Sequence, residues 1–120
     1  MARILAVDDE PDLRTAIERI LTRRGHEVTA AGGVTEALRL LNSLDPDLLL
    51  TDVRMPDGTG ADIAGEVRRR SPGTPVLFVS GYPREHVEMQ GIVGDGEEVL
   101  EKPFSPAQLA DAVEHAIDGR

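Results

Sequence analysis

The run Leu48–Gly58, which reads LLLTDVRMPDG, decides the fold of this chain. Three leucines and a threonine lead into Asp52, and Pro56 and Gly58 follow in a short turn. A continuous apolar run that is bounded by turn residues is typical of a strand buried on both faces, as in a parallel sheet. Asp52 then stands near the carboxyl end of that strand, where open α/β sheets bind their ligands. Taken alone, an aspartate that merely begins a turn is the simpler interpretation, so the rest of the chain decides its role.

Strand-like runs and helical patterns alternate along the rest of the chain. We expect strands at 3–7, 27–30, 48–52, 75–79 and 98–100. We expect helices with apolar faces at 13–21, 34–41, 63–67 and 109–117, and a short helix at 85–90 within a glycine-rich segment. This alternation predicts one α/β domain over residues 1–120, with a parallel sheet, right-handed crossovers and helices on both faces.

The composition excludes several classes of protein. The chain has 120 residues and no cysteine, which leaves room for one domain without disulfides or thiolate metal sites. Its apolar runs are too short to span a bilayer, and its first residues carry no signal-peptide pattern, so we expect a cytoplasmic protein without membrane contact. The net charge of −9 disfavours direct binding of nucleic acid, and the triplet 68–70 (RRR) fits a solvated helix end.

Polar groups follow four of the expected strands. They are Asp8 and Asp9 after the first strand, Asp52 after the third, Ser80 after the fourth and Lys102 after the fifth. If these strands are neighbours in one parallel sheet, the five groups meet at one edge. Three carboxylates held close together raise one another's pKa unless a cation lies between them, and Mg²⁺ is the cation that suits oxygen ligands beside phosphate.

Such an edge holds the parts that are needed to accept a phosphoryl group. Asp52 is the candidate nucleophile and would form an acyl phosphate. Mg²⁺ and Lys102 would neutralise the phosphoryl oxygens, and Ser80 would donate a hydrogen bond.

Four short motifs together resemble the receiver domain of two-component response regulators. They are VDDE at 7–10, Asp52 followed by MPDG at 55–58, SG at 80–81 and KPF at 102–104. Each motif alone is weak, but the set is specific, and it covers nearly the whole chain in the right order and spacing. The resemblance implies a flavodoxin-like doubly wound fold, with a five-stranded parallel sheet in the order 2-1-3-4-5 and five helices.

The resemblance also assigns roles by position. Asp52 matches the phosphoacceptor, Asp9 the direct Mg²⁺ ligand, and Asp8 the ligand that acts largely through water. Arg54 matches the position whose backbone carbonyl completes the metal site. The expected role is therefore a phosphoacceptor signalling domain, which is not an enzyme beyond its own phosphorylation and dephosphorylation.

Two further positions and the partners follow from the same resemblance. Ser80 matches the switch hydroxyl, and Lys102 matches the lysine that pairs with the phosphoryl group, with a cis bond expected between Lys102 and Pro103. The phosphoryl donor would be a phosphohistidine on a sensor histidine kinase or a phosphotransfer protein. Output would reach a downstream protein or a second copy through the face of the fourth helix, fifth strand and fifth helix. The segments 80–82 and 102–106 also resemble receivers that are joined to hybrid sensor kinases.

The sequence departs from the family pattern at the usual aromatic switch position. Val99 stands three residues before the lysine, where the family often has Tyr or Phe, and Tyr82 is a possible substitute. The family's coupling of switch hydroxyl and aromatic ring therefore has no counterpart at residue 99. Output in this chain would then be relayed by another route.

Two other functions compete with the receiver hypothesis. A phosphatase that resembles the haloacid dehalogenases needs an acid two residues after the nucleophile, and this chain has Arg54 there and no room for a capping domain. A receiver-like module that never takes phosphate would not need the acidic set together with Ser80 and Lys102. A measurement of Mg²⁺ affinity separates that module from a working receiver.

The remaining features have structural interpretations. His26, His86 and His115 show no metal-ligand spacing, so we expect surface residues. Asp57 fits turn chemistry, and Met55 fits packing beneath the loop.

Overall fold

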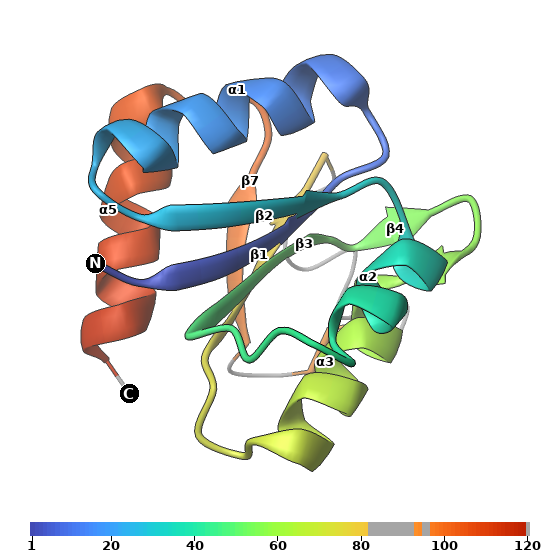
Figure 1. The fold of residues 1–120 in the computed structure, drawn as a ribbon. Helices are drawn as coiled ribbons and strands as arrows, with labels where there is room; N and C mark the ends of the chain where they lie inside the picture. The colour runs from blue at the N-terminus through green and yellow to red at the C-terminus, as the bar shows by residue number, and fades with distance from the viewer. Residues whose placement is uncertain (82–92, 95–96, 120) are drawn as a thin grey trace.

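A computed structural model describes residues 1–81, 93–94 and 97–119, and its centre is a five-stranded parallel sheet (Figure 1). The strands are β1 (Arg3–Val7), β2 (Glu27–Ala31), β3 (Leu48–Asp52), β6 (Val76–Ser80) and β7 (Glu98–Glu101). They lie in the order β2-β1-β3-β6-β7, and all four pairings are parallel. This order confirms the expected doubly wound arrangement and places β3 at the centre.

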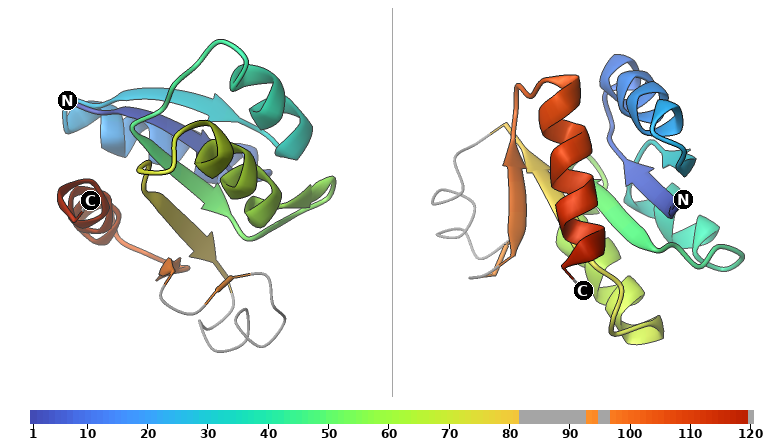
Figure 2. Two further views of the ribbon diagram at one scale, coloured as in Figure 1. Left: turned by 90° about the horizontal axis from the view of Figure 1, so that it is seen from below. Right: turned by 90° about the vertical axis from the view of Figure 1, so that its left-hand side faces the viewer.

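The described residues form four helices in two layers. They are α1 (Pro11–Arg23), α2 (Val34–Leu40), α3 (Gly60–Arg70) and α5 (Pro106–Asp118). Helices α1 and α5 cover one face of the sheet, and α2 and α3 cover the other (Figures 1 and 2). The helix expected at 85–90 lies outside the described residues. None of the described helices is long and apolar enough to cross a membrane.

Side chains of the central strand β3 pack into the core on both faces of the sheet, as its continuous apolar run predicts. Leu49 packs into the cluster that includes α2 and α3, whereas Leu48 and Leu50 pack into the cluster that includes α1 and α5. All three side chains are at most 1 % exposed. Burial of each side chain contributes about 2 kcal/mol of hydrophobic stabilisation. A shift of β3 along its axis would lose this burial, so the three leucines hold Asp52 in place at the end of the strand.

Local signals at the helix ends agree with the structure. Ser105 is the N-cap of α5: its side chain accepts a hydrogen bond from the backbone N–H of Gln108, whose side chain accepts one in return. Pro106 occupies the first turn of that helix, as expected. Gly25 follows α1 with a φ of +87°, the left-handed conformation that favours glycine.

Two expectations need correction. The stretch after β3 is more than the expected short turn: it forms a small antiparallel hairpin of β4 (Arg54–Met55) and β5 (Gly58–Thr59). His26 was expected at the surface, but it is only 8 % exposed. The backbone N–H of Ala2 donates to Nδ1 of His26 (3.2 Å), and Nε2 lies 2.9 Å from Oε1 of Glu114 on α5. These partners are 24 and 88 residues away in the sequence, so no local pattern reveals them.

The other minor expectations are confirmed where the structure describes them. Met55 is buried in the α2–α3 cluster, and His115 is exposed. The arginine triplet 68–70 is exposed at the end of α3. His86 and Tyr82 lie outside the described residues.

Candidate functional site

The sheet brings the predicted acidic groups together at the carboxyl ends of its central strands. Asp8 follows β1 directly, and Asp52 is the last residue of β3. Asp8, Asp9 and Asp52 each offer a carboxylate oxygen, and the three oxygens lie within 4.8 Å of one another. The prediction that these side chains meet at one sheet edge is therefore confirmed.

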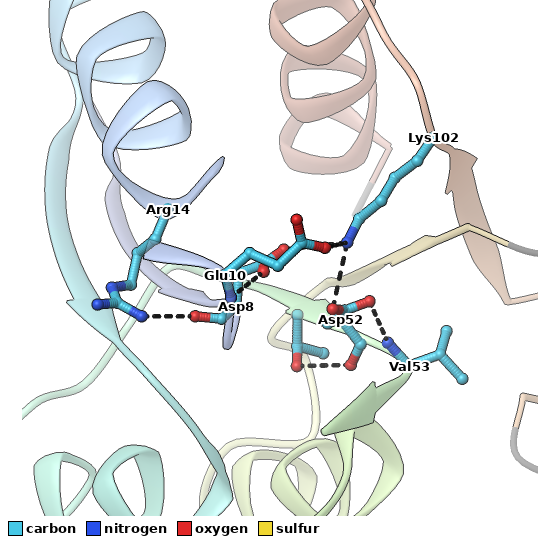
Figure 3. A network of polar contacts seen from close by, with 7 residues as sticks. Asp8, Glu10, Arg14, Asp52, Val53 and Lys102 are labelled. Carbon is cyan, nitrogen blue, oxygen red and sulfur yellow. Dashed lines mark hydrogen bonds and ion pairs between the residues drawn. The ribbon is translucent and has the colours of Figure 1, made fainter. Parts of the chain in front are cut away.

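Lys102, which follows β7, supplies the positive charge of the cluster (Figure 3). Its Nζ lies 3.2 Å from Oδ2 of Asp52, 3.2 Å from Oδ2 of Asp8 and 3.7 Å from Oε1 of Glu10. Burial by itself lowers the pKa of Lys102, but the charges of Asp52 and Asp8 outweigh burial, and the pKa of Lys102 is raised overall. The ammonium group is thus protonated at neutral pH.

Asp52 is buried, and two donors hold its carboxylate. Its Oδ1 accepts a hydrogen bond from the backbone N–H of Val53 (3.1 Å), and its Oδ2 accepts one from Lys102. Burial raises the pKa of Asp52, Lys102 lowers it, and the neighbouring Asp8 and Asp9 raise it again, with a net value of about 6. The carboxylate is ionised at neutral pH, but at a cost in free energy.

The cluster fits a small hard cation. Oδ1 of Asp8 accepts a hydrogen bond from the backbone N–H of Glu10 (2.9 Å). Oδ2 of Asp8 is buried and has no hydrogen-bond partner among the described residues, so the ammonium of Lys102 meets it only as a charge. A buried carboxylate oxygen that is unsatisfied beside two further carboxylates is a ready ligand for a cation. All-oxygen ligands are the set that Mg²⁺ prefers.

The other predicted site residues lie in the same cleft, which has a volume of about 480 Å³. It is lined by Asp9, Glu10, Asp52, Val53, Arg54, Ser80, Gly81 and Lys102. Ser80 is buried at the end of β6, and its carbonyl oxygen accepts a hydrogen bond from the backbone N–H of Lys102 (2.7 Å). The bond between Lys102 and Pro103 is cis, as expected. Arg54 is exposed, two residues after Asp52.

The position of the usual aromatic switch is filled by an aliphatic side chain. Val99 is half-buried on β7, beside Phe78 of β6 in the strand register. It packs against the α2–α3 cluster. Val99 therefore serves as a packing residue in this structure.

Two residues, Gly60 and Asp57, shape the site through contacts that the sequence does not indicate. Gly60 begins α3 directly against β3: a Cβ added there would lie 2.3 Å from the backbone oxygen of Asp52. Asp57 lies in the turn of the hairpin, as expected, but its carboxylate reaches across to α2. Hydrogen bonds from the backbone N–H groups of Thr35 and Val34 hold the pKa of Asp57 below its usual range. No local pattern marks either contact, because each joins segments that meet only in the folded chain.

Replacing Asp52 with asparagine is expected to stabilise the unphosphorylated, metal-free protein at alkaline pH. The pKa of Asp52 rises from 3.8 to about 6 on folding, so the cost of ionisation appears as the pH rises through 3.8 and is complete above about 6. The full shift corresponds to about 3 kcal/mol, and screening by solvent in the open cleft reduces this to about 1–2 kcal/mol. Thermal unfolding in EDTA should show a gain at about pH 8 roughly twice the gain at about pH 5. An equal gain at both pH values would contradict this assignment, and Asp111→Asn, at an exposed carboxylate, is the control.

Comparison with known proteins gives one consistent family. The model of the response regulator receiver domain matches residues 4–114. The response regulator protein PilR of Pseudomonas aeruginosa is 36 % identical over 115 residues, which is 96 % of this chain and 26 % of PilR. The probable transcriptional regulatory protein TcrX of Mycobacterium tuberculosis is 32 % identical over 85 % of this chain and 44 % of TcrX. The chain thus spans less than half the length of these curated relatives.

Solved structures agree with the sequence relatives. A response regulator receiver domain protein from Clostridium thermocellum superimposes with a TM-score of 0.85 at 30 % identity, over 99 % of this chain and 96 % of that chain. The chemotaxis response regulator CheY4 of Vibrio cholerae has the same TM-score and identity, over 97 % of this chain and 98 % of that chain. The acidic cluster, the lysine opposite it and these matches lead to one conclusion: the chain belongs to the family of response regulator receiver domains of two-component systems.

Proposed function

We propose that Asp52 accepts a phosphoryl group from a phosphohistidine with Mg²⁺ bound, and that this switches a surface that binds a partner. The donor is a sensor histidine kinase or a phosphotransfer protein. The observation that carries the proposal is the convergence on Asp52: the Nζ of Lys102 lies 3.2 Å from its carboxylate, and Asp8 and Asp9 present oxygens within 4.8 Å. Nucleophile, counter-charge and candidate metal ligands thus lie together at one edge of the sheet.

The residues of the cleft have distinct tasks in the transfer. A carboxylate oxygen of Asp52 forms a bond to phosphorus while the phosphorus–nitrogen bond to the donor imidazole breaks, and the electron pair of that bond stays with the imidazole. The backbone N–H of Val53 orients the attacking carboxylate through Oδ1. Lys102 stands 3.2 Å from the other oxygen and can follow the negative charge onto the phosphoryl group.

The proposed metal site uses Asp8, Asp9 and Asp52 together with the backbone carbonyl of Arg54. Asp9 is the direct ligand, and Asp8 acts largely through water. When bound, Mg²⁺ supplies positive charge to the phosphoryl oxygens and relieves the repulsion between the carboxylates. The buried, unsatisfied Oδ2 of Asp8 supports this use of the cluster.

Phosphorylation would add about 1.5–2 negative charges to the cleft. We propose that the hydroxyl of Ser80 and the ammonium of Lys102 then turn toward the phosphoryl group. The hydrogen bond between the backbones of these two residues would couple the segments that follow β6 and β7. The output face comprises β7, α5 and the helix expected at 85–90, and it would bind a downstream protein or a second copy of the chain.

The net charge of −9 supports a role without direct contact to nucleic acid or membrane, and we place the domain in the cytoplasm. We propose no enzyme activity for it beyond its own phosphorylation and dephosphorylation.

The proposal is tested by intact-mass measurement after incubation with Mg²⁺ and a small acyl-phosphate donor. The native chain should gain one phosphoryl group, Asp52→Asn should gain none, and the control Asp111→Asn should behave like the native chain. No gain combined with no Mg²⁺ binding would contradict the proposal and favour a module that works without phosphate. No gain with Mg²⁺ bound would show that transfer requires the cognate phosphohistidine.

A further inference from the structure

We propose that Asp57 is a positioning residue for the Mg²⁺ site, because it fixes the hairpin that carries the backbone carbonyl of Arg54. The inference rests on the proposed function and deepens it. Asp57 is not itself a ligand of the metal. It acts through the backbone of the β4–β5 hairpin.

Asp57, in the hairpin after β3, caps the N-terminus of α2. Its Oδ1 accepts a hydrogen bond from the backbone N–H of Val34, and its Oδ2 accepts one from Thr35, both at 2.9 Å. The first N–H groups of a helix have no partners within the helix. The N-cap of α2 itself is Gly33, which has no side chain to satisfy them. The carboxylate of Asp57 takes over this task from 22 and 23 residues away.

Two glycines let the hairpin lie directly against α2. A Cβ on Gly33 would stand 2.8 Å from Oδ1 of Asp57. A Cβ on Gly58 would stand 3.1 Å from Cγ2 of Val34, and Gly58 has a φ of +149°. The close contact between the hairpin and α2 thus depends on a glycine in each segment, Gly58 in the hairpin and Gly33 before α2.

The hairpin is held both at its base and at its tip, and Arg54 lies between these contacts. At the base, the backbone N–H of Gly60 donates to the carbonyl of Val53 (2.9 Å). At the tip, Asp57 holds the turn to α2. An isolated pair of two-residue strands is at best marginal in water, so the hairpin depends on its contacts with the rest of the fold. These are the burial of Met55 in the α2–α3 cluster and the hydrogen bonds of Asp57 at the tip, and loss of the tip contact leaves the Arg54 backbone less well fixed. A metal ligand that is not held in place lowers affinity, because its ordering must then accompany binding.

Calorimetric titration with Mg²⁺ at about 0.15 M salt tests this inference, since it needs no phosphoryl transfer. Asp57→Ala should raise the Kd for Mg²⁺ by ~5-fold or more. Asp57→Asn keeps one acceptor oxygen for the α2 backbone and should recover part of the loss. Glu36→Ala is the matched control: it removes a negative charge from the same hollow beside Asp9 and leaves the hairpin anchor intact, so its Kd should stay within about 2-fold of the native value.

Three outcomes would overturn the inference, and they are distinguishable. An unchanged Kd in Asp57→Ala together with a lower Tm would make Asp57 a helix cap only. Equal losses in Asp57→Ala, Asp57→Asn and Glu36→Ala would show that the negative charge acts at long range and not through the hairpin. Absence of Mg²⁺ binding in the native chain would overturn the proposed function itself, and the inference with it.

Discussion

Replacing Gly60 with alanine is expected to lower the free energy of unfolding by about 3–4 kcal/mol. A Cβ at this position would lie 2.3 Å from the backbone oxygen of Asp52 and 2.8 Å from Cγ2 of Thr51. The first of these atoms belongs to the central strand and cannot rotate away, so α3 and β3 must separate. A domain of this size is stable by only about 5–15 kcal/mol, so the loss is a large part of the total.

Denaturant unfolding measures the effect, and the same helix provides the control. Gly65 of α3 is exposed, and a Cβ there would meet nothing within 4 Å. Gly65→Ala should therefore stabilise the protein by up to about 1 kcal/mol through helix propensity. If both alanine variants are stabilised alike, the close approach of α3 to β3 is not as the structure has it.

Replacing Lys102 with methionine is expected to destabilise the metal-free protein by about 2–3 kcal/mol at about pH 8. The stem of the side chain is kept, but Asp52 and Asp8 lose the ammonium that lies 3.2 Å from each. Without that charge, the pKa of Asp52 rises further above its ordinary value. The penalty of ionisation therefore grows as the pH rises from about 4 and shrinks in acid.

Thermal unfolding with EDTA or with Mg²⁺ separates this charge effect from a packing effect. Mg²⁺ should raise the Tm of Lys102→Met more than that of the native chain, because a bound cation replaces part of the lost charge. Arg19→Met, which removes an exposed cation on α1, should change neither the Tm nor its response to Mg²⁺ appreciably. A Tm loss in Lys102→Met that is the same at about pH 5 and pH 8 would contradict the electrostatic origin.

The strands and the polar groups at their ends could be predicted because their signals are local. The run 48–52 is apolar on both faces and stops at a turn, so it marks a buried strand and puts Asp52 at its end. The order of the strands is a different matter, because periodicity says nothing about which strands are neighbours. That order came from the resemblance of four motifs to a family, and the parallel register confirms it.

The roles of some residues could not be predicted, because they depend on contacts between segments that are remote in the sequence. Nothing near Gly60 indicates that its α-carbon lies against the carbonyl of Asp52, and nothing near Asp57 indicates that its carboxylate reaches α2. His26 is buried for the same reason, since its partners are Ala2, just before β1, and Glu114 of the last helix. Such contacts follow from the packed fold, not from the pattern that produces it.

The buried ring of His26 also has a spectroscopic consequence. Because Nδ1 accepts a hydrogen bond from the backbone of Ala2, the neutral ring carries its proton on Nε2, where it faces Glu114 of α5. The nitrogen chemical shifts of this imidazole thus reveal which tautomer is present. They make His26 a native label for the contact of α5 with the segments that precede β1 and β2, without any added probe.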